Sequence, residues 1–398
     1  MGKAIGRRKW LVAVPLWLAL SVFAADQTRL ELPDHPELGI DVFREKRCIE
    51  CHSIWNEGGK IGPDLSKAMK EKSFYQILGL FWNHFPRMVA EMKARGLTIE
   101  EMKPDELKHL VAYLYYLNYF DAAGEFRRGR TAFKERQCVN CHTLGDEERK
   151  IGPPLDKFRW MISPVYLGTQ MWNHRPMMRE RFAEKQLVMP VFEKSDLADL
   201  LAYIRGMSIG ESEDRVYLEP GSPNRGKQVF DDKKCSTCHS VYGEGGDKAP
   251  DLASVQLSKG IAELTATLWN HLDKMEAAYR ELAMPFPEFQ PQEMGDLLTY
   301  LYFIRFFDED GNVAAGEALF REKGCASCHG EPGKGGEQAP DLALSDVDFG
   351  SFEFGARIWN HADQMGKMFE EELIAWPTFK DNEMRDLIFY LRSKAKQK

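Results

Sequence analysis

The amino-acid sequence predicts an all-α protein made of four tandem domains, and two observations lead to that prediction. First, one set of residues recurs four times at fixed distances from a repeated cysteine, and repetition over a whole unit indicates several copies of one fold. Second, apolar residues near the end of each copy recur at helical spacing, as in "DLLAYI" at 199–204. The domains expected from this repetition, called repeats 1 to 4 below, are 25–121, 122–212, 213–309 and 310–398.

Each repeat is expected to begin with one helix and to end with another that packs on it. A Gly stands nine residues before the first cysteine and a Phe five before it, and a Gly in a helix permits close approach of a second helix. These residues are Gly39, Gly129, Gly226 and Gly316, with Phe43, Phe133, Phe230 and Phe320. The expected partner is the C-terminal helix, which carries a recurrent tyrosine at Tyr113, Tyr203, Tyr300 and Tyr390.

Between these two helices the sequence predicts a Gly-rich loop and a further helix. The loop, "EGGKIGPDL" in repeat 1, carries a proline fifteen residues after the first cysteine: Pro63, Pro153, Pro250 and Pro340. The helix that follows is expected to end near a Trp-Asn-His triplet. In repeats 1 and 2, Pro86 and Pro176 follow the histidine by two residues, which predicts that a new helix starts there with proline in its first turn.

The eight cysteines identify the chemistry of the repeat. An exported protein with an even number of cysteines suggests disulfides, but all eight lie in four Cys-x-x-Cys-His motifs, and this spacing is the attachment signature of c-type haem. One such motif alone could be a redox dithiol or half a zinc site, whereas four make that reading very improbable. The expected attachment residues and proximal iron ligands are Cys48, Cys51 and His52, Cys138, Cys141 and His142, Cys235, Cys238 and His239, and Cys325, Cys328 and His329.

With these motifs, each repeat resembles a class I cytochrome c domain, and the resemblance covers nearly all of residues 36–395. It rests on the Gly and aromatic residue of the first helix, the Cys-x-x-Cys-His motif, the following "GPDL"-type proline and the aromatic C-terminal helix. The resemblance implies a small all-α fold around one covalent haem c, electron transfer without substrate chemistry, and a methionine as sixth iron ligand. It also implies that the loop proline orients the proximal histidine through a backbone carbonyl.

Two residue types compete for the sixth position, because every repeat has the pattern Trp-Asn-His-x-x-x-Met. The methionines lie at the family's ligand spacing after Asn and are preferred: Met88, Met178, Met275 and Met365. The alternative ligands are His84, His174, His271 and His361, which could otherwise bond a haem propionate while the tryptophan packs on the haem edge. Met189, in "MPVF", has no counterpart in the other repeats and is demoted. His35 and His109 do not recur and are expected to be solvated.

The N-terminus is expected to direct export. Residues 1–24 combine a basic head with a short apolar stretch, and Val22 and Ala24 fit a signal-peptide cleavage site, with an uncleaved anchor as the alternative. The expected location is the periplasm or another extracytoplasmic space, and no second apolar run could span a bilayer. The formal net charge is −8, and loss of the four basic residues of this segment leaves about −12, which disfavours nucleic acid and favours redox partners with basic surfaces.

These features favour an exported tetrahaem electron carrier over two alternatives. One alternative is an electron-transfer subunit of a membrane respiratory complex, which sequence does not separate from a free carrier. The other is a haem enzyme, a peroxidase or an oxyanion reductase, which would need an open sixth position and acid–base groups beside it. Every repeat keeps both candidate ligands, so the sequence disfavours an enzyme.

The connections predict that the repeats associate as 1 with 2 and 3 with 4. Repeats 1 and 3 end in long aromatic segments, "YLYYLNYF" and "YLYFIRFF", which could pack on the next repeat. The connection between repeats 2 and 3 is seven residues longer, polar and rich in Pro and Gly, and is expected to be a loose linker that proteases cut between about residues 206 and 223. Duplication of a two-haem ancestor would explain both features.

Overall fold

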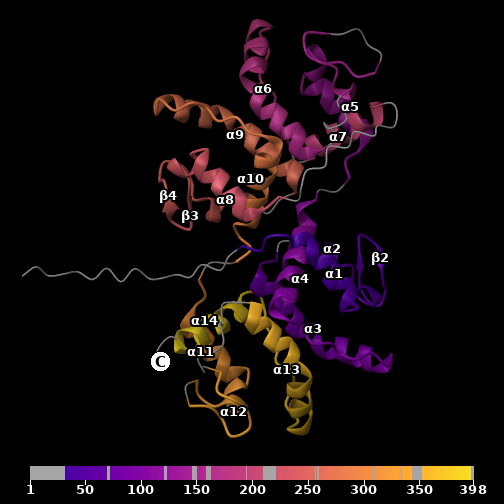
Figure 1. Ribbon diagram of the computed structural model, residues 1–398, viewed down its shortest axis with the longest axis vertical. Coiled ribbons are helices and arrows are strands. Elements are labelled where there is room, and N and C mark those ends of the chain that lie inside the picture. Colours follow the sequence, from indigo (N-terminus) through magenta and orange to yellow (C-terminus); the bar gives the residue numbers. More distant parts are fainter. Residues whose placement is uncertain are drawn as a thin grey trace, which may run out of the picture. The chain divides into compact units, whose positions relative to one another are not determined.

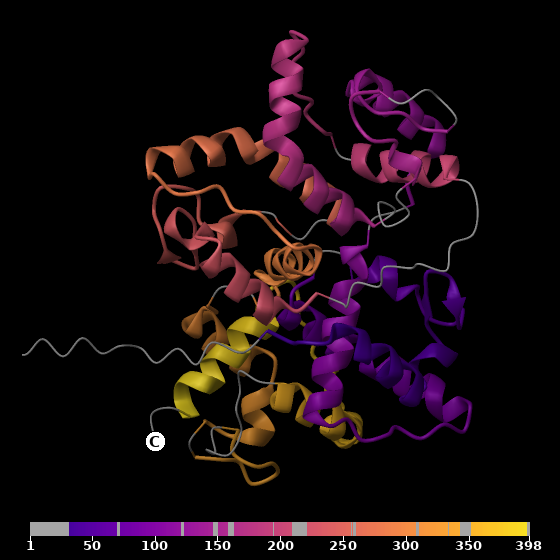
Figure 2. The same cartoon turned by 45° about the horizontal axis from the view of Figure 1, so that its top comes forward.

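The computed structural model describes residues 32–395 apart from short gaps, and Figures 1 and 2 show it from two directions. The gaps are 70–71, 121–122, 146–149, 158–162, 194, 209–220, 256, 258–259, 308–309, 333 and 343–351. The expected signal peptide, its cleavage site and most of the expected linker between repeats 2 and 3 lie outside the described residues. Within the described part of the chain, no helix is both long and apolar enough to cross a membrane.

The described chain is all-α, as the sequence predicts, with two short β-hairpins in repeats 1 and 3. Repeat 1 contains α1 (Gly39–Glu45), β1 (Ser53–Ile54), β2 (Glu57–Gly58), α2 (Leu65–Ala68), α3 (Phe74–Ala94) and α4 (Pro104–Tyr116). Repeat 2 contains α5 (Phe126–Glu135), α6 (Pro164–Glu184) and α7 (Asp196–Met207). Repeat 3 contains α8 (Pro223–Asp232), β3 (Ser240–Val241), β4 (Glu244–Gly245), α9 (Ile261–Glu281) and α10 (Pro291–Phe303). Repeat 4 contains α11 (Val313–Glu322), α12 (Cys325–His329), α13 (Phe352–Glu371) and α14 (Glu383–Ala395).

The first and last helices of every repeat cross at the recurrent glycine, which confirms the predicted contact. A Cβ atom added to Gly129 of α5 would lie 1.9 Å from the carbonyl oxygen of Asp199 in α7. The corresponding distances are 2.1 Å from Gly39 to His109, 2.0 Å from Gly226 to Asp296 and 2.1 Å from Gly316 to Asp386. The two backbones are therefore too close for any side chain at this position, and only glycine fits.

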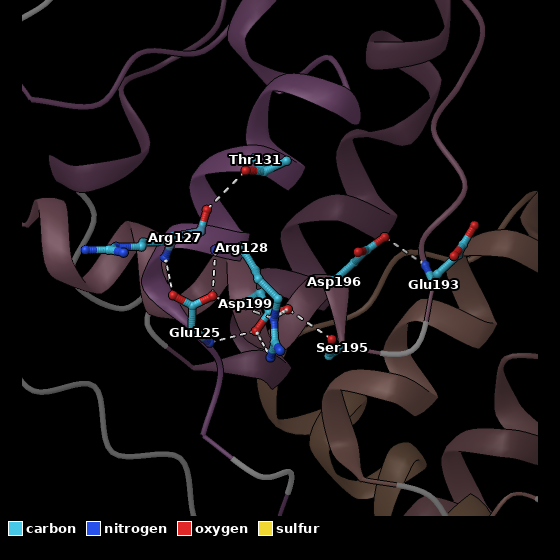
Figure 3. A network of polar contacts seen from close by, with 8 residues as sticks. All are labelled: Glu125, Arg127, Arg128, Thr131, Glu193, Ser195, Asp196 and Asp199. Atoms are coloured by element: carbon cyan, nitrogen blue, oxygen red, sulfur yellow. Dashed lines mark hydrogen bonds and ion pairs between the residues drawn. The ribbon is translucent and has the colours of Figure 1, made fainter.

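A buried aspartate ties the same two helices together in repeat 2 (Figure 3). The Asp199 carboxylate accepts hydrogen bonds from Nε and Nη2 of Arg128, both at 3.0 Å, from the backbone N–H of Glu125 at 2.6 Å, and from Ser195 Oγ at 2.9 Å. Burial alone would raise the pKa of Asp199, but these hydrogen bonds outweigh it and hold that pKa below its usual value. Asp296 repeats the arrangement with Arg225 in repeat 3.

We expect Asp199→Asn to destabilise repeat 2 by about 1–2 kcal/mol at neutral pH, because the amide keeps one acceptor oxygen but loses the carboxylate charge and the second acceptor oxygen. Since the pKa of Asp199 is lowered in the folded state, its stabilisation is present above the usual aspartate pKa of about 3.9 and is lost as pH falls through the folded value. Denaturant unfolding of both proteins at pH 7 and near pH 3 measures the difference. An equal loss at both pH values would contradict this origin.

The helix that carries the Trp-Asn-His triplet runs through the triplet without a break. The predicted helix boundary at Pro86 and Pro176 is wrong, since both prolines lie inside helices, α3 and α6 respectively. Proline at position 86 cannot donate to the carbonyl of Trp82, one turn earlier. In the structure that carbonyl accepts a hydrogen bond from Nε1 of Trp376 in repeat 4 at 3.1 Å, so a second repeat supplies the missing donor.

The repeats pack as 1 with 4 and 2 with 3. Helix α13 of repeat 4 lies against α3 and α4, and α6 of repeat 2 lies against α9 and α10 (Figure 1). A glycine marks each crossing: a Cβ on Gly355 would lie 2.5 Å from Leu107 and 3.0 Å from Leu78, and one on Gly168 would lie 2.6 Å from Thr265. Leu78 and Thr265 occupy the same position of the repeat as the two glycines, so a large residue meets a small one in both pairs.

The expected pairs, 1 with 2 and 3 with 4, are therefore wrong for the helices that the structure describes. The aromatic tails pack on each other: Tyr115 Oη donates to the carbonyl of Tyr302 at 3.1 Å, and Tyr302 Oη donates to the carbonyl of Tyr115 at 2.8 Å. The tail of repeat 3 also contacts the next repeat as expected, since the ring centres of Phe306 and Phe307 lie 6.5 and 6.1 Å from that of Phe352. If repeat 3 is put in the place of repeat 1, and repeat 4 in the place of repeat 2, the pair 1 with 4 becomes the pair 3 with 2. The two pairs are therefore equivalent, as duplication of a two-repeat ancestor would make them.

Candidate haem centres

The Cys-x-x-Cys-His motif follows the first helix of each repeat after one residue in the left-handed conformation. These residues are Arg47, Gln137, Lys234 and Gly324, with φ angles of 60°, 64°, 66° and 80°. The motif then forms a single 3₁₀ turn in repeats 1 to 3 and the short helix α12 in repeat 4. Side chains three residues apart in such a turn lie on one face, so the local fold places both cysteines of each motif side by side.

The first cysteine of each motif lies in apolar surroundings. Burial raises the pKa of the Cys48 and Cys325 thiols to about 11 and that of the Cys138 and Cys235 thiols to about 12. A zinc site or a reactive dithiol needs a thiolate, which a lowered pKa provides. The apolar surroundings of the first cysteine in each motif suit contact with an apolar ring system.

The loop proline holds the ring of each motif histidine, as the family resemblance implies. Nδ1 of His52, His142, His239 and His329 hydrogen-bonds the carbonyl oxygen of Pro63, Pro153, Pro250 and Pro340, at 3.0, 2.9, 2.9 and 2.9 Å. A Cβ on Gly62 or Gly152 would lie 2.4 or 2.6 Å from the ring, so the loop backbone packs directly on it. With Nδ1 donating to a carbonyl, the lone pair of Nε2 is free for a metal. The residues thus fit a haem iron with these histidines as proximal ligands.

In repeats 1, 2 and 3, the histidine of Trp-Asn-His lies close to the histidine of the Cys-x-x-Cys-His motif. The ring centres of His52 and His84 are 6.2 Å apart, and those of His239 and His271 are 6.3 Å apart. Burial and the neighbouring ring lower the pKa of His84 and of His271. In repeat 2, burial lowers the pKa of His142, and its neighbour His174 lowers it further. The four candidate methionines follow one turn later in α3, α6, α9 and α13, and all are half-buried.

The Trp-Asn pair in front of each of these histidines binds another repeat rather than a haem edge. Trp82 Nε1 donates a hydrogen bond to the carbonyl of Pro377 at 2.6 Å. Asn83 and Phe379 exchange two hydrogen bonds: Asn83 Nδ2 donates to the carbonyl of Phe379 at 2.7 Å, and the N–H of Phe379 donates to Asn83 Oδ1 at 2.8 Å. The indole of Trp82 also stacks on that of Trp376, with ring centres 4.5 Å apart. We call this set of contacts the Trp-Asn latch.

The latch occurs four times and is reciprocal within each pair of repeats. In the opposite direction, Trp359 and Asn360 of repeat 4 form the same hydrogen bonds with the backbone of Glu100 and Met102 in repeat 1. In the other pair, the tryptophan and asparagine bond the backbone of a Pro-x-Phe segment: Trp172 and Asn173 that of Pro287 and Phe289, and Trp269 and Asn270 that of Pro190 and Phe192.

Sequence reasoning missed the latch, although two signals for it are present. The triplet recurs with tryptophan and asparagine unchanged, which a ligand histidine alone does not require, and Pro-x-Phe recurs in repeats 2, 3 and 4. The "MPVF" segment belongs to this acceptor set, so Met189 occupies the position that Phe286 and Trp376 fill in the other repeats, where they stack on a latch tryptophan. Its demotion as an iron ligand agrees with this packing role.

The two histidines outside the repeat differ in their surroundings. His35 is 62% exposed and lies 3.0 Å from Glu37, as expected for a solvated residue. His109 lies in α4, where α1 crosses it, and among the described residues its Nδ1 is buried without a hydrogen-bond partner. His109 is half-buried, so the expectation that it is solvated holds only in part. It occupies the repeat position of Asp199, Asp296 and Asp386, which bond the start of the first helix.

Comparison with known proteins agrees with this geometry. Over 80 residues, the chain is 32% identical to the C subunit of nitric oxide reductase from Stutzerimonas stutzeri, a match that covers 19% of this chain and 54% of that protein, so it spans about half of the relative's length. No solved structure gives a significant match. The cytochrome c family model matches four times, over residues 36–118, 126–208, 223–302 and 313–395. The chain therefore belongs to the cytochrome c family, as four tandem cytochrome c domains with four covalently attached haem c groups.

Proposed function

We propose that the protein is an exported carrier that moves electrons through its four haems between redox proteins. Haem-based electron transfer follows from the four cytochrome c domains. The observation that carries the proposal is that all four centres are built alike: each has the Cys-x-x-Cys-His turn and a proximal histidine held by a proline carbonyl, followed by the same His-x-x-x-Met pattern. No repeat lacks its candidate sixth ligands, so no centre is set apart for substrate.

The haem supplies the reversible Fe(III)/Fe(II) couple, and the protein residues set its surroundings. The proline carbonyls hold the proximal rings in one tautomer and orientation, which limits rearrangement when the charge on the metal changes. Half-buried cysteines and aromatic core residues keep the surroundings apolar. The formal charge of about −12 expected after removal of residues 1–24 supports partners with basic surfaces.

A second candidate is supported by the relative that the comparison found. That protein is named as a subunit of nitric oxide reductase, so this chain could equally serve as the electron-transfer subunit of a larger membrane complex. The difference lies in the partner rather than in the four centres. Purification from the native membrane and soluble fractions tests it, since a subunit would co-purify with a membrane protein.

The proposed function predicts that the purified protein takes up four electrons reversibly and leaves carbon monoxide unbound. A spectroelectrochemical titration counts the electrons, and mass spectrometry counts four haems on a chain that begins near Ala25. Addition of carbon monoxide to the reduced protein should leave the Soret band unchanged, because each repeat offers its haem a sixth ligand, histidine or methionine, besides the proximal histidine. A haem that binds carbon monoxide in the native protein would favour an enzyme instead.

A further inference from the structure

We propose that the sixth iron ligands are His84, His174, His271 and His361, and that the methionines one turn later pack between repeats instead. This proposal deepens the proposed function and rests on its four haem centres. It departs from the methionine that the family resemblance favours, and its support comes from the described residues alone.

The distance between the paired rings is the first argument. An imidazole nitrogen binds a first-row metal at about 2.0 Å and the ring centre lies about 1.1 Å behind it, so two rings on opposite sides of one iron have centres about 6.2 Å apart. The observed separations are 6.2 Å for His52 and His84 and 6.3 Å for His239 and His271. Aromatic pairs elsewhere in the chain range from 4.5 Å for Trp82 and Trp376 to 6.5 Å for Phe306 and Phe352, so the separation fits an iron between the histidine rings and gains its weight from the orientation of their nitrogens.

The orientation of the rings is the second argument. On the proximal side, the bond from Nδ1 to the proline carbonyl directs Nε2 away from the loop. In repeats 2 and 4, Nδ1 of His174 bonds the carbonyl of Gln170 at 2.8 Å, and Nδ1 of His361 bonds the carbonyl of Arg357 at 2.9 Å. A backbone partner on one ring nitrogen fixes the tautomer and leaves the other nitrogen as a ligand, which is the usual arrangement of metal-bound histidine.

The methionines have packing partners of their own. Met88 and Met365 pack against a small apolar cluster of Phe85, Val89 and Ala362, which joins repeats 1 and 4. Met178 and Met275 pack against the main core. A flexible thioether side chain fills such irregular contacts well, so recurrence of the methionine needs no iron to explain it.

The latch supplies the third argument, because it fixes the helix turn that carries the histidine. Trp82 and Asn83 bond the backbone of repeat 4 immediately before His84, and the same order holds in the other three repeats. A ligand must be held in one place to bind iron with little loss of conformational entropy. The recurrence of Trp-Asn-His as one unit then has a physical reason: one repeat positions the ligand of another.

The test compares two substitutions in the full-length tetrahaem protein. Met88→Leu keeps the apolar volume and is expected to leave the near-infrared charge-transfer bands, the EPR spectrum and the four midpoint potentials unchanged. His84→Ala is expected to make one haem of four high-spin and able to bind carbon monoxide, and added imidazole should restore the low-spin spectrum. Met275→Leu and His271→Ala form the same comparison in repeat 3.

The native protein is measured first, so that the test does not depend on folding of the alanine variants. Two nitrogen ligands predict near-infrared bands without a sulfur-to-iron charge-transfer band, and potentials lower than methionine ligation would give. A sulfur-to-iron band in the native protein that Met88→Leu reduces by one haem in four would overturn the proposal. Either ligand leaves the reversible four-electron titration intact, whereas carbon monoxide binding by the native protein would contradict the proposed function itself.

Discussion

Gly129→Ala is expected to destabilise repeat 2 by about 3 kcal/mol, a large effect for the addition of a single methyl group. The new Cβ would lie 1.9 Å from the carbonyl oxygen of Asp199 and 2.7 Å from Cβ of Tyr203, so the methyl group meets backbone that cannot rotate away. Helices α5 and α7 must separate, and the Arg128–Asp199 hydrogen bonds across the same crossing weaken with them. A loss of that size corresponds to roughly 10–20 °C in the unfolding midpoint of a domain of this length.

The matched control is Gly366→Ala, which lies inside α13. Its Cβ would meet only the Trp376 ring, at 3.8 Å, an ordinary van der Waals contact. Alanine has the higher helix propensity, so this variant should be neutral or more stable by up to about 1 kcal/mol. Thermal unfolding of both proteins followed by Soret circular dichroism makes the comparison. Equal midpoints for the two variants would mean that the glycine crossing does not hold repeat 2 together.

The fold within one repeat could be predicted because its signals are local and occur four times. Gly129 and Pro153 stand at fixed distances from Cys138, and the structure gives each the expected contact, with Asp199 and with His142 respectively. Each of these contacts joins two points of the same repeat. The repetition of the pattern separates such constraints from chance, since surface positions vary freely between the repeats.

The arrangement of the repeats could not be predicted, because its signals join residues that are far apart in sequence. The latch of Trp82 bonds a carbonyl 295 residues later, and any of the four acceptor segments has the same chemistry. The connections along the chain led to the prediction that consecutive repeats pair, and Pro86 led to the prediction of a helix boundary. Both inferences fail for the same reason: a contact from repeat 4 provides the donor that proline lacks and the partner that the helix needs.

The residue after the histidine of each Trp-Asn-His triplet helps to explain which repeats pair. Between repeats 2 and 3 this residue is Arg175, which is 2% exposed, lies over the ring of Trp269 and forms ion pairs with Asp273 at 2.5 Å and Glu276 at 3.4 Å. Between repeats 1 and 4 the same position is apolar, with Phe85 facing Ala362. In repeats 1 and 4 the position of Glu276 holds Val89 and Gly366, so a mixed pair would bury Arg175 without this acid, although Asp363 of repeat 4 stands where repeat 3 has Asp273. Loss of a buried partner of the guanidinium disfavours the mixed pairs.

The strongest consequence of this pairing is that a chain cut between repeats 2 and 3 should not separate. A protease site inserted between residues 212 and 213 gives two fragments with two haems each. Each fragment contributes one repeat to both pairs, so two reciprocal latches and the Tyr115–Tyr302 contact hold the cut protein together. We expect the two fragments to elute as one species of unchanged mass, which light scattering or native mass spectrometry measures.

Each pair of repeats has two latches, and alanine in place of Trp82, Asn83, Trp269 and Asn270 removes one of the two from each pair. Each buried hydrogen bond contributes about 1 kcal/mol and each buried indole about 3 kcal/mol or more, so the cut variant should dissociate at concentrations where the cut native protein does not. Trp55→Ala is the control, because Trp55 is 52% exposed and contacts Phe120 within its own repeat. Free two-haem fragments from the cut native protein would mean that the pairs 1 with 4 and 2 with 3 do not hold the molecule together in solution.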